Sequence, residues 1–217
     1  MAGSVIASVG SNFQLLQSSA ISGITLVQKL SSFENVREPR VAYFMKKLLQ
    51  TLQQLHSKNI AHLDLKPENI MVSESTEDHI KLLDFGSSRQ LRTNCSRSKQ
   101  TVVELSDPEF MSPEVAQCKP VTLSADMWSV GVLTYVLLSG ISPFIGDSDN
   151  ETIDNVIHCR WSFNPNHFDQ TSTEAKQFIS SLLQADPRSY VANLLTYHIL
   201  PFFTHIQVGI TNVLNKK

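Results

Sequence analysis

The sequence predicts a mainly α-helical fold that carries one small β-hairpin. Three segments, residues 38–57, 123–138 and 174–183, have apolar residues at helical spacing. Two short apolar runs, residues 70–72 and 80–83, flank a polar segment, which is the pattern of two antiparallel strands joined by a turn. We therefore expect helices to form most of the core and the hairpin to add a small sheet.

The first elements can be placed in chain order. Residues 1–25 are rich in serine and small residues and show no clean period of 3.6 or 2, so we expect most of this segment to be weakly ordered. The helix over residues 38–57 has Pro39 in its first turn, where proline is well tolerated. Its expected apolar face comprises Val41, Phe44, Met45, Leu48, Leu49, Leu52 and Leu55.

The hairpin carries a polar residue at each end. Asn69 precedes the first apolar run and Asp84 follows the second. Because the two ends of an antiparallel hairpin meet at one edge, we expect these two side chains to converge. Amide and carboxylate oxygens are ligands that magnesium uses, so Asn69 and Asp84 are predicted magnesium ligands.

The second half of the chain contains a polar loop and more helices. Residues 86–107 are polar and basic with few apolar anchors, which favours a mobile, solvated surface loop over a nucleic-acid patch. The helix over residues 123–138 is apolar nearly all round and should be buried. A weaker helix is expected over residues 150–159, one with a single apolar stripe over 174–183, and a last one over 191–200.

Length and composition set only mild limits. The 217 residues suffice for a domain with a buried core, and a net charge of -2 gives no overall reason to expect nucleic acid or an acidic membrane surface as a partner. No apolar run approaches the roughly 20 residues of a membrane helix, and the start shows no signal-peptide pattern. The three cysteines lack metal-ligand spacing. We therefore expect a cytoplasmic protein with reduced thiols and no membrane partner.

The most informative motif is HLDLKPEN at residues 62–69, followed by DFG at residues 84–86. Its spacing suits phosphoryl transfer, with Asp64 as a base for a substrate hydroxyl and Lys66 as a cation facing the transferred group. Alone, an HxD tripeptide is common, and its aspartate is then usually a cap or turn residue. The added lysine and the two magnesium ligands at fixed spacing favour the chemical interpretation.

The motif resembles the catalytic core of a protein kinase. Residues 108–114 (PEFMSPE) resemble the end of a kinase activation loop, and residues 126–131 (DMWSVG) resemble the start of its central helix. With residues 138–144 and 186–188, their order and spacing match the C-terminal lobe over residues 38–203. The residues in these segments are similar to those of the calmodulin-dependent group of kinases, nearest to the death-associated, myosin light chain and titin-like kinases.

The resemblance implies a protein kinase-like fold in which residues 26–203 form the C-terminal, larger lobe. Residues 1–25 would precede this lobe, and residues 204–217 would form a tail. A kinase also needs a glycine-rich loop and a strand lysine, and neither is found before Leu55. We therefore expect the N-terminal lobe to be absent from this chain and to be supplied by a longer product.

The resemblance also implies a function, transfer of the γ-phosphoryl group of ATP, with Mg²⁺, to serine or threonine of a protein substrate. It implies catalytic roles for Asp64 and Lys66, and hydrogen bonds from the catalytic-loop backbone to Asp126. The implied cofactor contacts are Lys66, Glu68, Asn69 and Asp84. The alternative is a catalytically silent docking module, whose substrate-binding surface persists without ATP chemistry.

Two residues depart from the family pattern near the site. Leu63 replaces an arginine, so it offers no cation to a phosphorylated loop residue. Asp107 replaces a threonine, and its charge is expected to compete for Lys66. For His62 and Phe85 we expect a structural role, as groups packed beneath the site.

Overall fold

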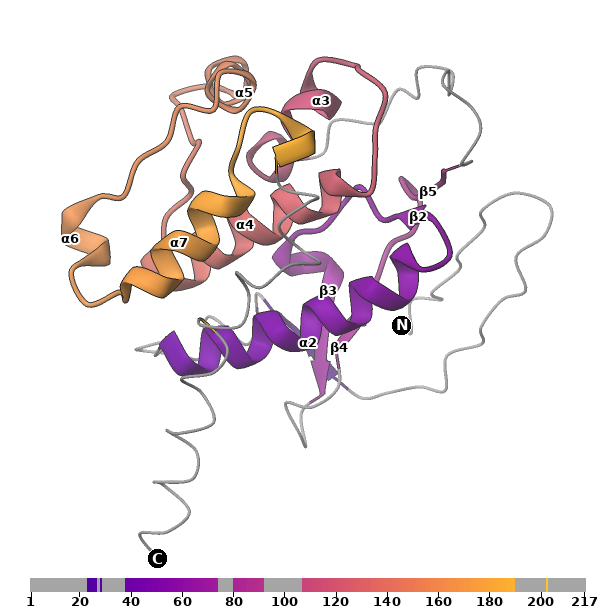
Figure 1. Ribbon diagram of the computed structural model, residues 1–217, viewed down its shortest axis with the longest axis horizontal. Coiled ribbons are helices and arrows are strands. Elements are labelled where there is room, and N and C mark those ends of the chain that lie inside the picture. The colour runs from indigo at the N-terminus through magenta and orange to yellow at the C-terminus, as the bar shows by residue number, and fades with distance from the viewer. Residues whose placement is uncertain are drawn as a thin grey trace, which may run out of the picture.

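The computed structural model describes residues 23–26, 28, 38–73, 80–91, 107–189 and 202. These residues form a helical body with two small sheets (Figure 1). The predicted mainly α-helical fold is confirmed. None of the described helices is long and apolar enough to cross a membrane.

The elements follow one another in a simple order. The helices are α2 (Glu38–His56), α3 (Pro113–Ala116), α4 (Ser124–Ser139), α5 (Asp149–Ile157), α6 (Pro165–Phe168) and α7 (Thr173–Leu182). The strands are β1 (Gly23–Thr25), β2 (Ile60–Ala61), β3 (Ile70–Ser73), β4 (Ile80–Leu82) and β5 (Arg89–Gln90), and two 3-10 turns are η2 (Pro67–Asn69) and η3 (Pro108–Phe110). The four helices predicted within the described residues are confirmed, with ends that differ by two residues at most. The helix expected over residues 191–200 lies outside the described residues.

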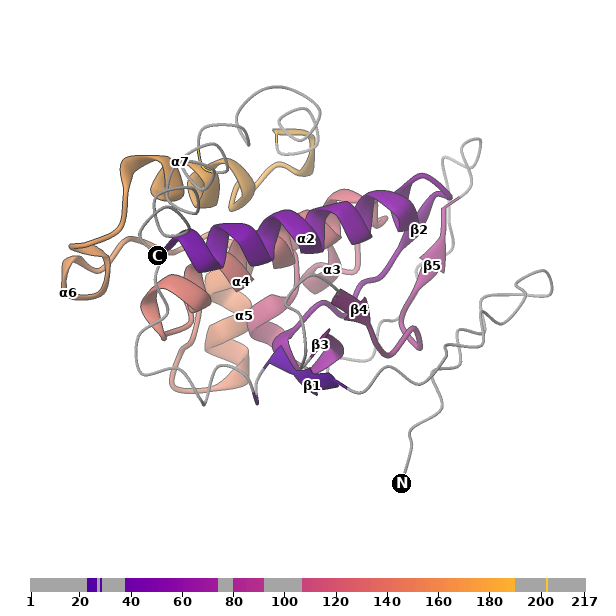
Figure 2. The same ribbon diagram turned by 90° about the horizontal axis from the view of Figure 1, so that it is seen from below.

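Helix α2 forms because its sequence is amphipathic. Its buried face is made by Val41, Ala42, Met45, Leu48 and Leu52, which recur at helical spacing. That face packs against α4 and β4. Figures 1 and 2 show α2 running across the molecule, with α6 toward one end and β2 and β5 toward the other. The C-terminal end of α2 therefore lies directly before the predicted motif at residues 62–69.

The predicted hairpin is confirmed, and it gains a third strand. Strands β3 and β4 pair antiparallel with Ile70 opposite Leu82, and β1 adds to the free edge of β3. Most of residues 1–25 were expected to be weakly ordered; Gly23–Thr25 form β1, and residues 1–22 lie outside the described residues. A strand of three residues is too short to show the alternation of apolar and polar side chains by which strands are predicted, so the sequence did not indicate β1. A Cβ atom at position 23 would lie 2.8 Å from the main-chain oxygen of Val72, so the close pairing also requires glycine.

Helix α4 is the centre of the core, as its all-round apolar sequence predicts. It packs against α2, α6 and α7, and nearly all its residues are buried. Trp128 stacks on Phe144 with ring centroids 5.2 Å apart. The helix ends where Gly140 takes φ 74°, a left-handed conformation that glycine adopts readily.

The predicted polar loop over residues 86–107 is only partly described. Arg89–Gln90 forms β5, which pairs antiparallel with β2 directly before the motif. Residues 92–106 lie outside the described residues. The start of this loop is thus tied to the chain that leads into residues 62–69.

Candidate active site

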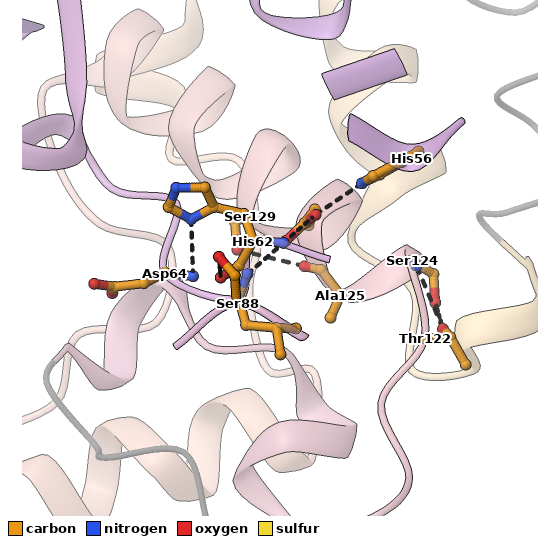
Figure 3. Close-up of polar contacts among 10 residues, drawn as sticks. His56, His62, Asp64, Ser88, Thr122, Ser124, Ala125 and Ser129 are labelled. Atoms are coloured by element: carbon orange, nitrogen blue, oxygen red, sulfur yellow. Dashed lines mark hydrogen bonds and ion pairs between the residues drawn. The ribbon is translucent and has the colours of Figure 1, made fainter. Parts of the chain in front are cut away.

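One buried carboxylate holds the backbone of the predicted catalytic turn. Asp126, in the first turn of α4, is 0% exposed. Its oxygens accept the His62 N–H at 2.9 and 3.1 Å, and Oδ1 also accepts the Leu63 N–H at 2.8 Å. The Nε2 atom of His56, at the end of α2, lies 2.7 Å from Asp126 Oδ2 (Figure 3). These bonds confirm the contact between Asp126 and the loop backbone that the resemblance implied.

The turn is strained, and the bonds to Asp126 offset the strain. Leu63 has φ 65°, in the left-handed region, where a residue with a side chain loses about 1–2 kcal/mol. Hydrogen bonds to a charged acceptor contribute about 1.5–3 kcal/mol each. The N–H groups of His62 and Leu63 both bond to the carboxylate. The free energy that the two bonds contribute is therefore enough to offset the strain and keep Leu63 in this conformation.

The buried ring of His62 is neutral and has a defined tautomer. Its Nε2 lies 3.0 Å from the carbonyl oxygen of Leu83, which can only accept, so Nε2 carries the hydrogen. Its Nδ1 then accepts the Asp64 N–H at 3.4 Å (Figure 3). Burial lowers the pKa of His62, although the charge of Asp126 opposes this effect. The expected packing role is confirmed, since the rings of His62 and Phe85 lie 4.8 Å apart.

Three of the predicted site residues, Asp64, Lys66 and Asn69, are brought together around η2. Asn69 Nδ2 donates to the main-chain oxygen of Asp64 at 2.9 Å and to its Oδ2 at 2.7 Å. Because both partners only accept, the orientation of the amide is fixed, and none of the described residues donates to its Oδ1. Lys66 Nζ lies 3.6 Å from Asp64 Oδ1. Asp64 thus has an amide at one oxygen and a cation near the other.

Lys66 lies closer to Asp107 than to Asp64. Its Nζ donates to Asp107 Oδ2 at 2.6 Å, and the side chain of Lys66 is 14% exposed against 46% for Asp107. Partial burial lowers the pKa of Lys66, but the hydrogen bond to Asp107 and the nearby carboxylates raise it overall. The contact between Asp107 and Lys66 that the expected competition requires is therefore present.

Asp84 is a backbone neighbour of Asn69. The Leu83 N–H donates to the main-chain oxygen of Asn69 at 2.8 Å, so the hairpin places Asn69 opposite the residue before Asp84. Asp84 itself is exposed, has φ 55°, and accepts the Gly86 N–H on Oδ1 at 3.1 Å. The prediction that both residues converge at one edge of the hairpin agrees with this arrangement.

The donor set at this edge fits magnesium. An amide oxygen and a carboxylate are hard oxygen ligands. Within the described residues, no group of three or more His, Cys, Asp or Glu side chains is placed to hold a metal ion by itself. Magnesium is usually held by one or two protein oxygens and completes its shell with water and substrate phosphates. Asn69 and Asp84 would therefore hold a magnesium ion only together with further oxygen ligands.

A cleft opens beside Asp64. It is open to solvent, and its lining includes Asp64, Asp107 and apolar side chains such as Phe110 and Val115. Glu68, the remaining predicted cofactor contact, is exposed in η2, where its charge contributes to the raised pKa of Lys66. The structure therefore brings Asp64, Lys66 and Asn69 into contact and leaves Glu68 at the surface.

Sequence reasoning missed two polar residues that support the site. His56 contacts Asp126, and the Ser88 hydroxyl donates to the main-chain oxygen of His62 at 3.1 Å. Their partners lie 70 and 26 positions away, so no local pattern reveals these bonds. The one available signal was the position of His56 in the last turn of α2, where a histidine suits the helix dipole.

A loop held by a buried aspartate, a hairpin that ends in DFG and a helical body define a protein kinase fold. The chain belongs to the protein kinase family, since the model of the protein kinase domain matches residues 10–194. The resemblance based on motifs starts at Glu38, and the match to the family model begins further upstream, at residue 10.

The relatives fall in the calmodulin-dependent group, as the motifs predicted. Myosin light chain kinase 3 of Danio rerio is 48% identical over 140 residues, which cover 64% of this chain and 19% of that protein. Death-associated protein kinase 2 of Mus musculus is 41% identical over 170 residues, 77% of this chain and 45% of that protein. The autoinhibited serine kinase domain of titin superposes with a TM-score of 0.72 at 32% identity, over 87% of this chain and 58% of that chain. This chain thus spans less than half the length of either curated relative.

Proposed function

We propose that this chain carries the catalytic loop of a serine/threonine protein kinase, which transfers the γ-phosphoryl group of ATP to a hydroxyl of a protein substrate. The observation that carries the proposal is the Asn69 amide. Its Nδ2 bonds to Asp64 at 2.9 and 2.7 Å, which leaves Oδ1 without a donor among the described residues, and the main-chain oxygen of Asn69 accepts the N–H of Leu83, the residue before Asp84. One residue thus orients the proposed base and offers an oxygen to a metal ion.

Asp64 would act on the substrate hydroxyl. Its Oδ2 is fixed by Asn69, and its N–H by the neutral ring of His62, so the carboxylate is held in one orientation. A carboxylate in this position accepts the proton of an attacking hydroxyl. The cleft beside Asp64 is the surface where we expect the segment that carries the hydroxyl to bind.

The cofactor contacts divide between the metal ion and the phosphates. Bound ATP with Mg²⁺ supplies the phosphoryl group and a divalent charge that offsets the charge of the phosphates. Asn69 Oδ1 and the Asp84 carboxylate would hold the metal ion, and Lys66 would face the transferred group. We propose that Glu68 contacts the bound nucleotide at the edge of its site. We also propose that the protein works in the cytoplasm.

A second candidate function, a docking module without catalysis, is favoured by one contact. The Lys66 ammonium is already bonded to Asp107 at 2.6 Å. A cation held by an internal carboxylate is less available to a phosphoryl group. Such a module would use the cleft beside Asp64 to bind a protein segment, and it would do so without ATP.

Calorimetric titration of the chain with ATP and MgCl₂ tests the first proposal. We expect saturable binding that depends on magnesium and is lost in Asp84→Asn, because this change removes the charge that holds the metal ion. Asparagine is the better variant here, since it tolerates the φ of 55° at this position whereas most residues do not.

Asp64→Asn is the matched control, because it alters the proposed base and spares both metal ligands. It should bind the nucleotide and fail to phosphorylate a general protein substrate. Absence of nucleotide binding by the unaltered chain, with protein binding that persists in Asp84→Asn, would instead support the docking module.

A further inference from the structure

Lys66 lies between two carboxylates, and the closer one has no part in the proposed transfer. The Nζ atom is 2.6 Å from Asp107 Oδ2 and 3.6 Å from Asp64 Oδ1. An exposed Asp107 side chain would gain little from an ion pair, but Lys66 is partly buried, so water screens this pair less than a fully exposed one. The contact is therefore a real constraint on the ammonium group.

Asp107 is presented to Lys66 by a fixed part of the backbone. It precedes η3 in an extended conformation, and its main-chain oxygen accepts the Phe110 N–H at 3.3 Å. Pro108 follows it and restricts its backbone further. The hydroxyl of Ser129 on α4 donates to the Phe110 oxygen at 2.8 Å, which ties η3 to the core. The carboxylate is thus positioned by packed elements.

We propose that Asp107 is a positioning residue that competes with the transferred phosphoryl group for Lys66 and thereby slows the reaction. The inference rests on the proposed function, because it takes Lys66 as the cation that faces the phosphoryl group. One ammonium cannot make its best contact with both anions at once. Removal of the Asp107 charge therefore frees Lys66 for the phosphoryl group, and the chain gains activity.

The first test requires no catalysis. The rate at which an N-hydroxysuccinimide ester acylates Lys66 is measured by peptide mass spectrometry, with the exposed Lys119 as internal reference. Loss of one ion pair should make Lys66 in Asp107→Asn react about two- to fivefold faster. Asp154→Asn, which removes the exposed Asp154–Arg160 pair away from the site, is the matched control and should leave the Lys66 rate unchanged.

The second test measures the preference for a triphosphate. Affinities for a non-hydrolysable ATP analogue and for ADP, both with Mg²⁺, are compared by calorimetry. Only the triphosphate carries the group that Lys66 faces, so the ratio of the two affinities should rise about two- to fivefold in Asp107→Asn. The rate of phosphoryl transfer should rise in Asp107→Asn and in Asp107→Thr, whereas a merely structural role for Asp107 predicts a lower rate.

Both variants are first checked for cooperative thermal unfolding, and Asp107→Thr replaces Asp107→Asn if the latter does not fold. Unchanged acylation of Lys66 would overturn the proposal, as would faster acylation with an unchanged triphosphate preference. A chain that binds neither nucleotide would reject the proposed function as a whole, and this inference with it. A chain that binds both nucleotides while Lys66 does not respond would reject the inference alone.

Discussion

At the scale of single residues, His62 is the group whose environment is most closely defined. It donates to the Leu83 oxygen, accepts the Asp64 N–H, and packs on the ring of Phe85. A second proton on this ring would have to sit on Nδ1, where it would face the Asp64 N–H. The folded protein therefore holds this histidine in its neutral form.

Stability is expected to fall as the pH drops below the ordinary histidine pKa of 6.5. Below that pH the unfolded chain protonates His62, whereas the folded chain does not, because burial lowers the pKa. The unfolded state then binds more protons, so the free energy of unfolding decreases with falling pH by up to about 1.4 kcal/mol per pH unit until the folded pKa is reached. Urea denaturation at about pH 7.5 and about pH 5.5 measures the change.

The control for this prediction compares two variants. His62→Asn removes the buried titrating ring, and the dependence of stability on pH in this range should become flatter. Ile145→Ala removes an exposed apolar group and no titrating group, and should leave the dependence equal to that of the unaltered chain. An equal pH dependence in His62→Asn and the unaltered chain would contradict the role assigned to burial.

Residues within one short motif were the predictable part of the site. Asp64, Lys66 and Asn69 lie within six positions of one another, so their contact follows from a single turn. The contributions of His56 and Ser88 were not predictable, because each depends on how distant elements pack. Local sequence thus reveals which groups meet in the candidate site better than which distant groups support them.

At the scale of elements, predictability follows the length of the periodic pattern. Helices α2 and α4 have 19 and 16 residues, long enough for an apolar period or a continuous apolar run to be clear. Strand β1 has three residues, and its partner β3 lies far along the chain. Its pairing is a property of the edge that β3 offers, and therefore could not be predicted from residues 23–25.

The packing of α4 on α7 depends on the absence of a side chain at Gly131. A Cβ atom there would lie 2.9 Å from Leu182 Cβ and 2.9 Å from Leu183 Cδ2. Gly131→Ala would gain about 1 kcal/mol from helix propensity, but overpacking typically costs about 1–3 kcal/mol. We expect a net loss of stability in urea denaturation, because both neighbours are buried. A variant more stable than the original chain would show that α7 moves aside at no cost.

At the scale of the whole molecule, the chain before α2 shares the main core. Leu26, directly after β1, is 3% exposed and belongs to the same apolar cluster as Val72 and Leu82. The predicted boundary at residue 26 therefore falls beside a buried core residue. The short segment was not recognised as part of the sheet because a single buried leucine has no pattern of its own.

Leu26→Ala should destabilise the protein by about 2–5 kcal/mol, the usual range for a large-to-small change in a core. Ile145→Ala is the matched control, since Ile145 is 63% exposed and its truncation should change the stability by less than about 0.5 kcal/mol. Chemical denaturation of both variants measures the difference. Equal stabilities would mean that β1 and Leu26 contribute nothing to the folded state.

The contact between Asp126 and the turn at residues 62–64 also bears on the order of folding. The bonded groups are separated by 63 and 64 positions, whereas α2 and the β3–β4 hairpin need only neighbouring residues. Contacts that close long loops generally form late. An intermediate in which α4 has not yet docked would therefore have much of the native helix content and no ordered turn at residues 62–64. During unfolding, we expect this turn to lose its order before most of the circular dichroism signal is lost.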